Sequence, residues 1–254
     1  MTTQIDTKQA AETLLNRRQP EQKFDALPID IRPDNIDSAL AVHKQMIELK
    51  QHKVAGWKCL LPPAEGKVVI SPIFSDSYHT GAQACLMPEH TRARIEPEIA
   101  FVLAQDLPAK AGGYSEQEIQ SVIASAHMAL ELMQARYKDD CDAQFYERLA
   151  DCLTNQGLFV GPEIDKQTAF NTATIDIGVT QNGKTTAYEG KHPNKLAGNP
   201  LSWFVNFALE NGFELKKGQA IITGSFAGVL ELEFGQTEIS YKGLGEYTVE
   251  LVSK

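Results

Sequence analysis

The stretch ARIEPEIAFVLA (residues 93–104) is the segment that decides the expected fold. Charged and apolar residues alternate along its first half, and a period of two is typical of a β-strand with one apolar face. Glu96 and Glu98 then share one face, while the apolar residues around them point to the opposite face. The segment is therefore predicted to be a strand that carries two neighbouring carboxylates on one side.

Similar β-type runs surround this strand in the sequence. The hairpin signal Asn182-Gly183 is the strongest of them, because both turn residues tolerate a positive φ. The run at residues 126–137 alternates enough to be a strand, although a helix is also compatible with it. The remaining predicted strands are residues 54–61, 67–74, 157–161, 173–180 and 184–190 and the C-terminal runs QAIITGS, GVLELEF, TEISYKG and GEYTVELV.

Five segments carry apolar residues at the spacing of an amphipathic helix. Ser115 and Glu118 form a capping-box pattern for one of them, and Gly212 is placed to end another. The predicted helices are residues 7–17, 35–51, 115–126, 141–153 and 199–212. The predicted fold class is therefore α+β and β-rich, with a helical N-terminal arm (residues 1–52) and one β-rich domain (residues 53–254).

The composition restricts the partners of the chain. It has 254 residues, of which 43% are hydrophobic, and a formal net charge of −9. This balance argues against nucleic acid, whose phosphates need clustered Lys and Arg, and it disfavours anionic membrane surfaces. No membrane span is expected, since uninterrupted apolar runs of about 18 residues are absent. The start, MTTQIDTKQAAETLL, does not resemble a signal peptide. The four scattered cysteines favour reduced thiols in a cytoplasmic protein.

The two carboxylates on the strand face are the first candidate for chemistry. They repel each other unless a positive charge lies between them, and hard cations such as Mg²⁺ prefer such oxygen ligands. Exposure of both side chains on a solvated strand face is the alternative. Glu131 adds to the metal interpretation, because it lies in the apolar run AHMALELMQ, where burial of a lone carboxylate is costly. A surface position on an amphipathic segment is the alternative for Glu131.

Lys58 is the second candidate. It lies in the predicted strand VAGWKCLL (residues 54–61), on the face it shares with Gly56 and Leu60. Such a lysine either extends its ammonium group into solvent or presents it to an anion or a reacting proton. The small Gly56 beside it is expected to leave room for a ligand.

The order of several motifs in the sequence resembles that of a known family. The motifs GWKCLL, IEPEIAFVLAQDLP, ALELMQARY and ITGS occur in the order seen in 2-hydroxypenta-2,4-dienoate hydratases and 4-oxalocrotonate decarboxylases, which belong to the fumarylacetoacetate hydrolase superfamily. The preceding stretch RPDNIDSALAVHKQ is similar to the family's P-x-x-x-x-E-A-Y-x-x-Q segment. The resemblance covers about residues 28–252. The R-x-E-x-E-x-A segment with its distant third Glu is specific for the superfamily but not for one reaction.

The resemblance implies roles for the candidate residues. Glu96, Glu98 and Glu131 would hold a divalent metal, Mg²⁺ or Mn²⁺, and Lys58 would face a small 2-oxo or 2-hydroxydienoic acid. The implied substrate-binding residues near its carboxylate are Thr223 and Ser225, although Ser225 is equally compatible with a turn. The implied fold is a mixed β-roll of the fumarylacetoacetate hydrolase C-terminal type with peripheral helices, assembled as a homo-oligomer.

The sequence departs from the family pattern at three places. The family's P-D-[FY]-G loop is missing from ISPIFSDSYH (residues 70–79), where Asp76 or His79 is the candidate replacement. Cys59 stands where the family has a glycine after the lysine. The family's A-D-x-A-[SA]-x-G stretch is lengthened to ADCLTNQG (residues 150–157). Metal binding is therefore better supported by the sequence than the identity of the substrate.

Three functions are compatible with these residues. The first is a metal-dependent hydratase that adds water to a 2-hydroxyalka-2,4-dienoate to give a 4-hydroxy-2-oxo acid. The second is a sister reaction, either decarboxylation of a 2-oxo-dioic acid or C–C hydrolysis of an acylpyruvate, which needs a base such as His79, His90 or His127. The third is a catalytically silent ligand-binding subunit, which the missing loop would favour.

Overall fold

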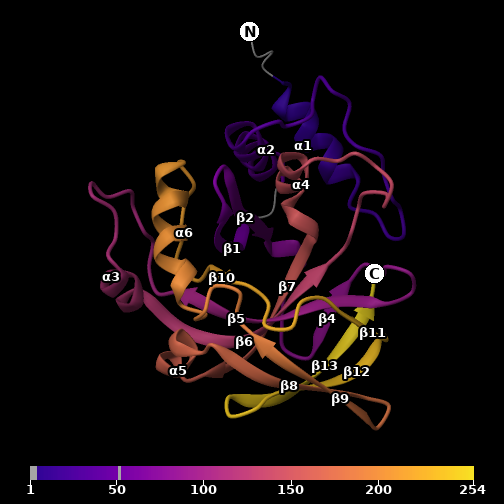
Figure 1. The fold of residues 1–254 in the computed structure, drawn as a ribbon, viewed down its shortest axis with the longest axis vertical. Coiled ribbons are helices and arrows are strands. Elements are labelled where there is room, and N and C mark those ends of the chain that lie inside the picture. The colour runs from indigo at the N-terminus through magenta and orange to yellow at the C-terminus, as the bar shows by residue number, and fades with distance from the viewer. Residues whose placement is uncertain (1–4, 51–52) are drawn as a thin grey trace.

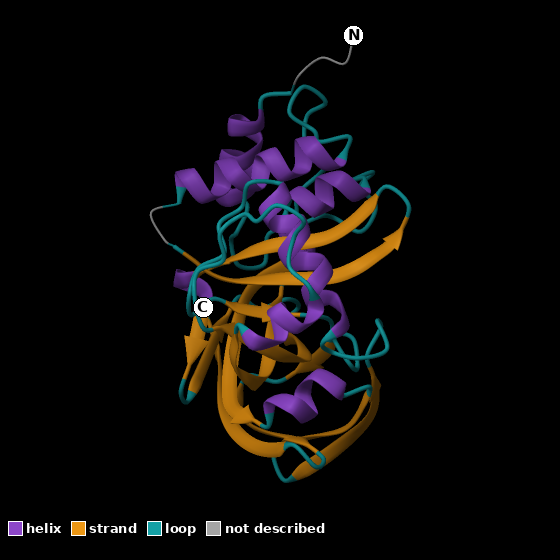
Figure 2. Ribbon diagram, turned by 90° about the vertical axis from the view of Figure 1, so that its left-hand side faces the viewer, coloured by secondary structure: helices purple, strands orange, loops and turns teal. Residues whose placement is uncertain are grey.

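The computed structural model describes residues 5–50 and 53–254. It is a mixed α/β, strand-rich structure in which a curled sheet carries helices at its upper end (Figures 1 and 2). Two sheets are present in the described chain. The larger has eight strands in the order β2-β1-β10-β5-β6-β7-β3, with β11 also paired to β5, and the smaller has five in the order β4-β13-β12-β8-β9.

The strands of the larger sheet are β1 (Val54–Ala64), β2 (Lys67–Phe74), β3 (Tyr78–Thr80), β5 (Ala93–Leu103), β6 (Ile123–Met133), β7 (Asn155–Ile164), β10 (Ala220–Ile222) and β11 (Leu230–Leu232). Those of the smaller sheet are β4 (Gln83–Leu86), β8 (Thr174–Gln181), β9 (Lys184–Lys191), β12 (Gly235–Tyr241) and β13 (Gly245–Ser253). The helices are α1 (Thr7–Asn16), α2 (Ile36–Leu49), α3 (Glu116–Ser121), α4 (Phe145–Ala150), α5 (Lys166–Asn171) and α6 (Asn199–Glu210), with the 3-10 turns η1 (Ser75–Ser77) and η2 (Cys152–Thr154).

Most predicted elements are present. The hairpin β8–β9 turns at Asn182 and Gly183, whose φ angles are +51° and +73°, as a two-residue turn of this type requires. The capping box of Ser115 and Glu118 starts α3. The run at 126–137 is a strand rather than a helix, since β6 covers Ile123–Met133. Helix α2 begins after its N-cap Asn35 and ends at Leu49, while residue 51 of the predicted helix lies outside the described residues.

Two helix predictions were too long. The helix expected over 115–126 ends at Ser121, because from Ile123 the chain pairs with β5 as a strand. The helix expected over 141–153 is reduced to α4, because the backbone of the following turn η2 has positive φ angles that a helix cannot contain. The short elements β3, β4 and α5 were not predicted.

The N-terminal helices pack on the rest of the chain. Leu14 of α1 and Met46 of α2 are fully buried and belong to the same hydrophobic cluster as Trp57 of β1 and Phe101 of β5. Helix α2 contacts α4 and β2. None of the helices in the described part of the chain is long and apolar enough to cross a lipid bilayer.

A smaller apolar cluster positions the candidate site. It lies on the face of the larger sheet that also carries Glu98 and Glu131, since strand residues two apart share a face. Its buried members are Ile73, Ala100, Ala129, Leu158, Val160, Ala220 and Ile222. The carboxylates therefore lie beside an interior from which these side chains exclude water.

Candidate metal centre

Strand register brings the three predicted carboxylates together. Glu96 and Glu131 lie directly opposite each other in the antiparallel pairing of β5 with β6, and Glu98 lies two residues further along the same face. One carboxylate oxygen from each lies within 4.8 Å of the others. Glu98 is 1% exposed and Glu131 is fully buried, whereas Glu96 is partly accessible. The group is thus reached from solvent on the Glu96 side.

Glu131 has two different carboxylate oxygens. Its Oε1 accepts hydrogen bonds from Nζ of Lys58 at 2.8 Å and from Nδ2 of Asn155 at 2.9 Å. Its Oε2 is buried and has no hydrogen-bond partner among the described residues. A buried carboxylate oxygen without a partner is costly, so this atom is available for a ligand that the chain itself does not supply.

Glu98 is fixed by a backbone amide. The N–H of Gly224, just after β10, donates to Oε2 of Glu98 at 2.6 Å. Gly224 has a φ of +123°, and a Cβ at this position would lie 2.5 Å from the side chain of Leu60 and 2.9 Å from that of Pro193. A side chain here would collide with Leu60 and Pro193, so glycine is required at the residue whose amide binds the carboxylate.

Burial and mutual repulsion shift the acidities of the group. Burial raises the pKa of Glu98 well above its usual range, and the charges of Glu131 and Glu96 raise it further. Burial, followed by the charge of Glu131, raises the pKa of Glu96 to about 7. Burial lowers the pKa of Lys58, but attraction by Glu131 and Glu96 outweighs burial, so the net shift is upward. One ammonium group therefore faces three carboxylates that favour additional positive charge.

These residues fit a divalent cation. The donor set is three carboxylates, which are the ligands that Mg²⁺ and Mn²⁺ prefer. The unpartnered Oε2 of Glu131 and the close approach of the three side chains both favour a cation among them. The described residues offer no second group of this kind.

The other predicted site residues flank Gly224, whose amide binds Glu98. Thr223 is fully buried, and its Oγ1 lies 3.5 Å from Nε2 of His192. Oγ of Ser225 is within hydrogen-bond distance of the carbonyl oxygens of Pro97 (3.3 Å) and Gly228 (3.2 Å), so its hydroxyl takes part in a turn. Substrate contacts of both residues stay a prediction.

The pairing of β1 with β10 requires a glycine at position 56. A Cβ there would lie 2.5 Å from the carbonyl oxygen of Ala220, because β1 and β10 pair closely in parallel. The close pairing of the two strands by itself requires a glycine here, and the space for a ligand stays a prediction. A cavity of about 900 Å³ does lie near β1, but Trp57 and Ala55 line it, and their side chains are on the strand face opposite Lys58.

Sequence reasoning did not assign Asn155 or Gly224 to the carboxylates and did not single out His192, which lies beside Thr223. Asn155 and the amide of Gly224 each hold a carboxylate. Asn155 lies in the ADCLTNQG stretch and Gly224 in the ITGS motif, but neither was expected to bind a glutamate. His192 is 1% exposed, and burial lowers its pKa to about 4, so it is neutral at pH 7. The sequence signal that lies near His192 is the ITGS motif, which contains its neighbour Thr223.

Asp76 and His79 were the candidate replacements for the missing loop, and His79, His90 and His127 were the candidate bases. Asp76 lies on the exposed side of η1, where it accepts a hydrogen bond from Nζ of Lys50 at 2.7 Å. His79 is on β3, His90 is in an exposed turn, and His127 contacts Ser125 and the carbonyl of Gly161. Within the described residues, none of these histidines forms a hydrogen bond with the three carboxylates.

The chain is similar in sequence to two hydratases. No protein-family model matches the chain. It is 24% identical over 190 residues to a 2-keto-4-pentenoate hydratase of Paraburkholderia phymatum, covering 71% of this chain and 68% of that protein. It is 23% identical over 268 aligned positions to a 2-oxo-hept-4-ene-1,7-dioate hydratase of Escherichia coli, covering 95% and 96%.

Solved structures show the same fold. A 4-oxalocrotonate decarboxylase from Pseudomonas putida G7, complexed with magnesium and adipate, superposes with a TM-score of 0.76 at 17% identity and covers 97% of both chains. A fumarylpyruvate hydrolase from Pseudomonas aeruginosa, in complex with Mn²⁺ and pyruvate, gives a TM-score of 0.54 at 15% identity and covers 81% of this chain and 93% of that one. In sequence and in fold, the chain is thus similar to the hydratases and decarboxylases of the fumarylacetoacetate hydrolase superfamily that its motifs indicated.

Proposed function

We propose that the protein is a metal-dependent hydratase that adds water to a 2-hydroxyalka-2,4-dienoate and forms a 4-hydroxy-2-oxo acid. The convergence of Glu96, Glu98 and Glu131 beside Lys58 carries this proposal. The two relatives named as hydratases support the choice of reaction. A Mg²⁺ or Mn²⁺ ion held by the three carboxylates would supply Lewis acidity toward the 2-oxo acid.

The residues of the chain would bind and orient the substrate. The ammonium of Lys58 would pair with the substrate carboxylate, since a charge-assisted contact in a water-poor site is strong. Thr223 and Ser225 would line the same end of the substrate. The apolar side chains of Ala100 and Ile222 would keep bulk water from the hydrocarbon part, because both belong to the buried cluster next to the site.

Decarboxylation of a 2-oxo-dioic acid is the second candidate. The fold similarity to the decarboxylase, over 97% of both chains, supports it. C–C hydrolysis has less support, because it needs a base. Within the described residues, His79, His90 and His127 form no hydrogen bond with the carboxylates. A silent ligand-binding subunit is the outcome to be accepted if no reaction is found.

The test is turnover of a substrate panel by the purified protein with Mg²⁺ or Mn²⁺. Loss of dienol absorbance identifies hydration, CO₂ release identifies decarboxylation, and two carboxylic products identify hydrolysis. Lys58→Met should lower kcat/KM by roughly 10²–10³-fold on the correct substrate, because a preorganised charge at the site is lost. No turnover of any compound in the panel would contradict the enzyme proposal.

We also propose a cytoplasmic homo-oligomer in which residues 53–254 form the catalytic domain and residues 1–52 the helical arm. Leu14 and Leu40, two large apolar residues of the arm, are buried within the chain. Ile29 and Val229 are the exposed large hydrophobic residues of the described chain. Oligomerisation therefore rests on the resemblance, and light scattering that finds only a 28.0 kDa species would refute it.

A further inference from the structure

The turn η2 (Cys152–Thr154) has an unusual backbone. Its three residues have φ angles of +61°, +49° and +67°, which form a run of left-handed conformations without a glycine. L-residues rarely adopt this conformation, and never cheaply in succession. Such a turn persists only where its surroundings hold it, and turns of this kind concentrate at functional sites.

This turn holds the lysine–carboxylate pair of the site. The carbonyl oxygen of Leu153 accepts a hydrogen bond from Nζ of Lys58 at 3.4 Å. Asn155, the residue after the turn, donates from its side chain to Oε1 of Glu131 at 2.9 Å. The left-handed backbone therefore aims two groups at the two partners of one buried ion pair.

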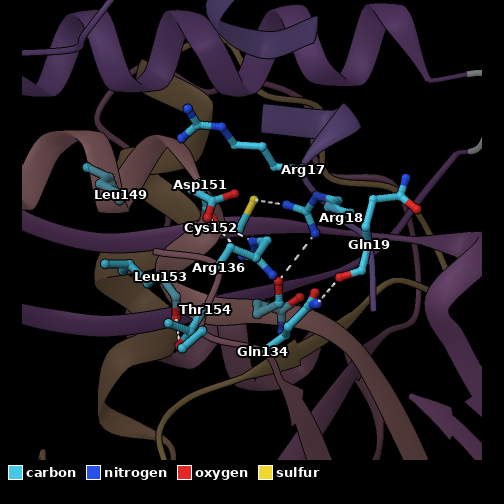
Figure 3. Close-up of polar contacts among 12 residues, drawn as sticks. Arg17, Arg18, Gln19, Gln134, Arg136, Leu149, Asp151, Cys152, Leu153 and Thr154 are labelled. Atoms are coloured by element: carbon cyan, nitrogen blue, oxygen red, sulfur yellow. Dashed lines mark hydrogen bonds and ion pairs between the residues drawn. The ribbon is translucent and has the colours of Figure 1, made fainter. Parts of the chain in front are cut away.

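Arg18, which lies just after α1, binds the turn at both ends. Its guanidinium donates to Sγ of Cys152 at 3.2 Å (Figure 3) and to the carbonyl oxygen of Asn155 at 3.3 Å. These contacts connect residues more than 130 positions apart in the sequence. The neighbouring Arg17 does not bind the turn; it donates to the carbonyl of Asp25 at 2.9 Å.

The other supports of the turn come from the sheet domain itself. The amide of Gln134 donates to the carbonyl of Thr154 at 2.8 Å, and Arg136 donates from Nε to the carboxylate of Asp151 at 2.8 Å. The side chain of Gln134 in turn donates to the carbonyl of Gln19, next to Arg18 (Figure 3). Arg18 thus supplies the direct hydrogen bonds from the N-terminal arm to the turn, and Gln19 supports the turn through Gln134.

We propose that Arg18 is a positioning residue of the metal site. It fixes the left-handed turn, and the turn holds Lys58 and Glu131 in the geometry that binds the cation. The metal-binding part of this inference rests on the proposed function, whereas the restraint of the turn by Arg18 does not. Metal ligands generally depend on such outer contacts, whose loss lowers affinity or activity by about 10–100-fold.

The test compares Arg18→Met with Arg17→Met, an adjacent and chemically matched control. Mn²⁺ affinity is measured by calorimetry without substrate, and exchange of the Gln134 amide is measured by hydrogen–deuterium exchange on the metal-free protein. Arg18→Met should weaken Mn²⁺ binding by about tenfold and accelerate exchange of this amide, since its acceptor Thr154 is no longer held. Arg17→Met should change Mn²⁺ affinity by less than about twofold, and Arg18→Lys should be intermediate.

The outcomes separate this inference from the proposed function. Unchanged Mn²⁺ affinity and exchange in Arg18→Met, or equal effects in Arg17→Met, would overturn the role of Arg18. Should the wild-type protein bind no Mn²⁺, the metal proposal fails and the role of Arg18 at a metal site fails with it; exchange then decides only whether Arg18 holds the turn. If Arg18→Met does not fold, Cys152→Ala removes one acceptor instead, and wild-type behaviour of both Cys152→Ala and Arg18→Lys would refute the inference.

Discussion

Removal of the Lys58 ammonium should destabilise the metal-free protein. In the ion pair with Glu131, the side chain of Lys58 is 11% exposed and that of Glu131 is fully buried. Loss of one partner from a buried pair costs about 3–5 kcal/mol, because the other charge stays behind without compensation. Asn155 still donates to Glu131 in Lys58→Met, so we expect a value near the lower end, about 3 kcal/mol.

The magnitude can be measured by thermal unfolding in the presence of a chelator. For a protein of this size, 1 kcal/mol corresponds to roughly 2–4 °C, so Tm should fall by about 6–12 °C. Saturating Mn²⁺ should raise the Tm of Lys58→Met more than that of the wild type, since the cation replaces the lost positive charge beside Glu131. Tm is read by circular dichroism at one protein concentration for every variant and condition.

Lys242→Met is the matched control. Lys242 forms an ion pair with Asp176 at 3.1 Å, but its side chain is 79% exposed, and such surface pairs contribute at most about 1 kcal/mol. A Tm of Lys58→Met within about 2 °C of the control in chelator would refute the argument that the buried pair is strongly coupled. Equal stabilisation of wild type and Lys58→Met by Mn²⁺ would refute the argument that the cation and the ammonium share Glu131.

Three further predictions follow from the same structure. Glu131→Gln keeps the shape of the side chain but removes its charge, and calorimetry should show at least roughly 100-fold weaker Mn²⁺ binding; unchanged affinity would exclude it as a ligand. Burial lowers the pKa of His43 to about 4. Between pH 6.5 and 4, His43 is therefore protonated in the unfolded state but neutral in the folded state, and acid favours unfolding. Over this range, proton uptake should lower stability by up to about 3 kcal/mol in urea titrations, and His43→Gln should lose that part of the dependence, whereas His192 keeps its own. Gly224→Ala should lower Tm by several degrees more than Gly218→Ala, because both glycines have positive φ but only Gly224 would clash, with Leu60; equal losses would contradict the packing argument.

Local patterns in the sequence were sufficient for much of the fold. Alternation placed Glu96 and Glu98 on one strand face, and the Asn182-Gly183 pair predicted the hairpin, because each signal depends only on residues a few positions apart. The same short range explains the failures. Helical periodicity at 115–126 continued past Ser121, where pairing with β5 overrides local propensity.

The candidate site, like the fold, could be predicted from the sequence only in part. The sequence by itself determined which carboxylates and which lysine are candidates, since residue type and motif order carry that information. Only the tertiary structure decided that Glu131 lies opposite Glu96, that Gly224 binds Glu98 from 126 positions away, and that Arg18 reaches the turn before Asn155. These contacts depend on strand register and on the docking of the N-terminal arm, and no local pattern encodes either, because both are set by packing among distant segments.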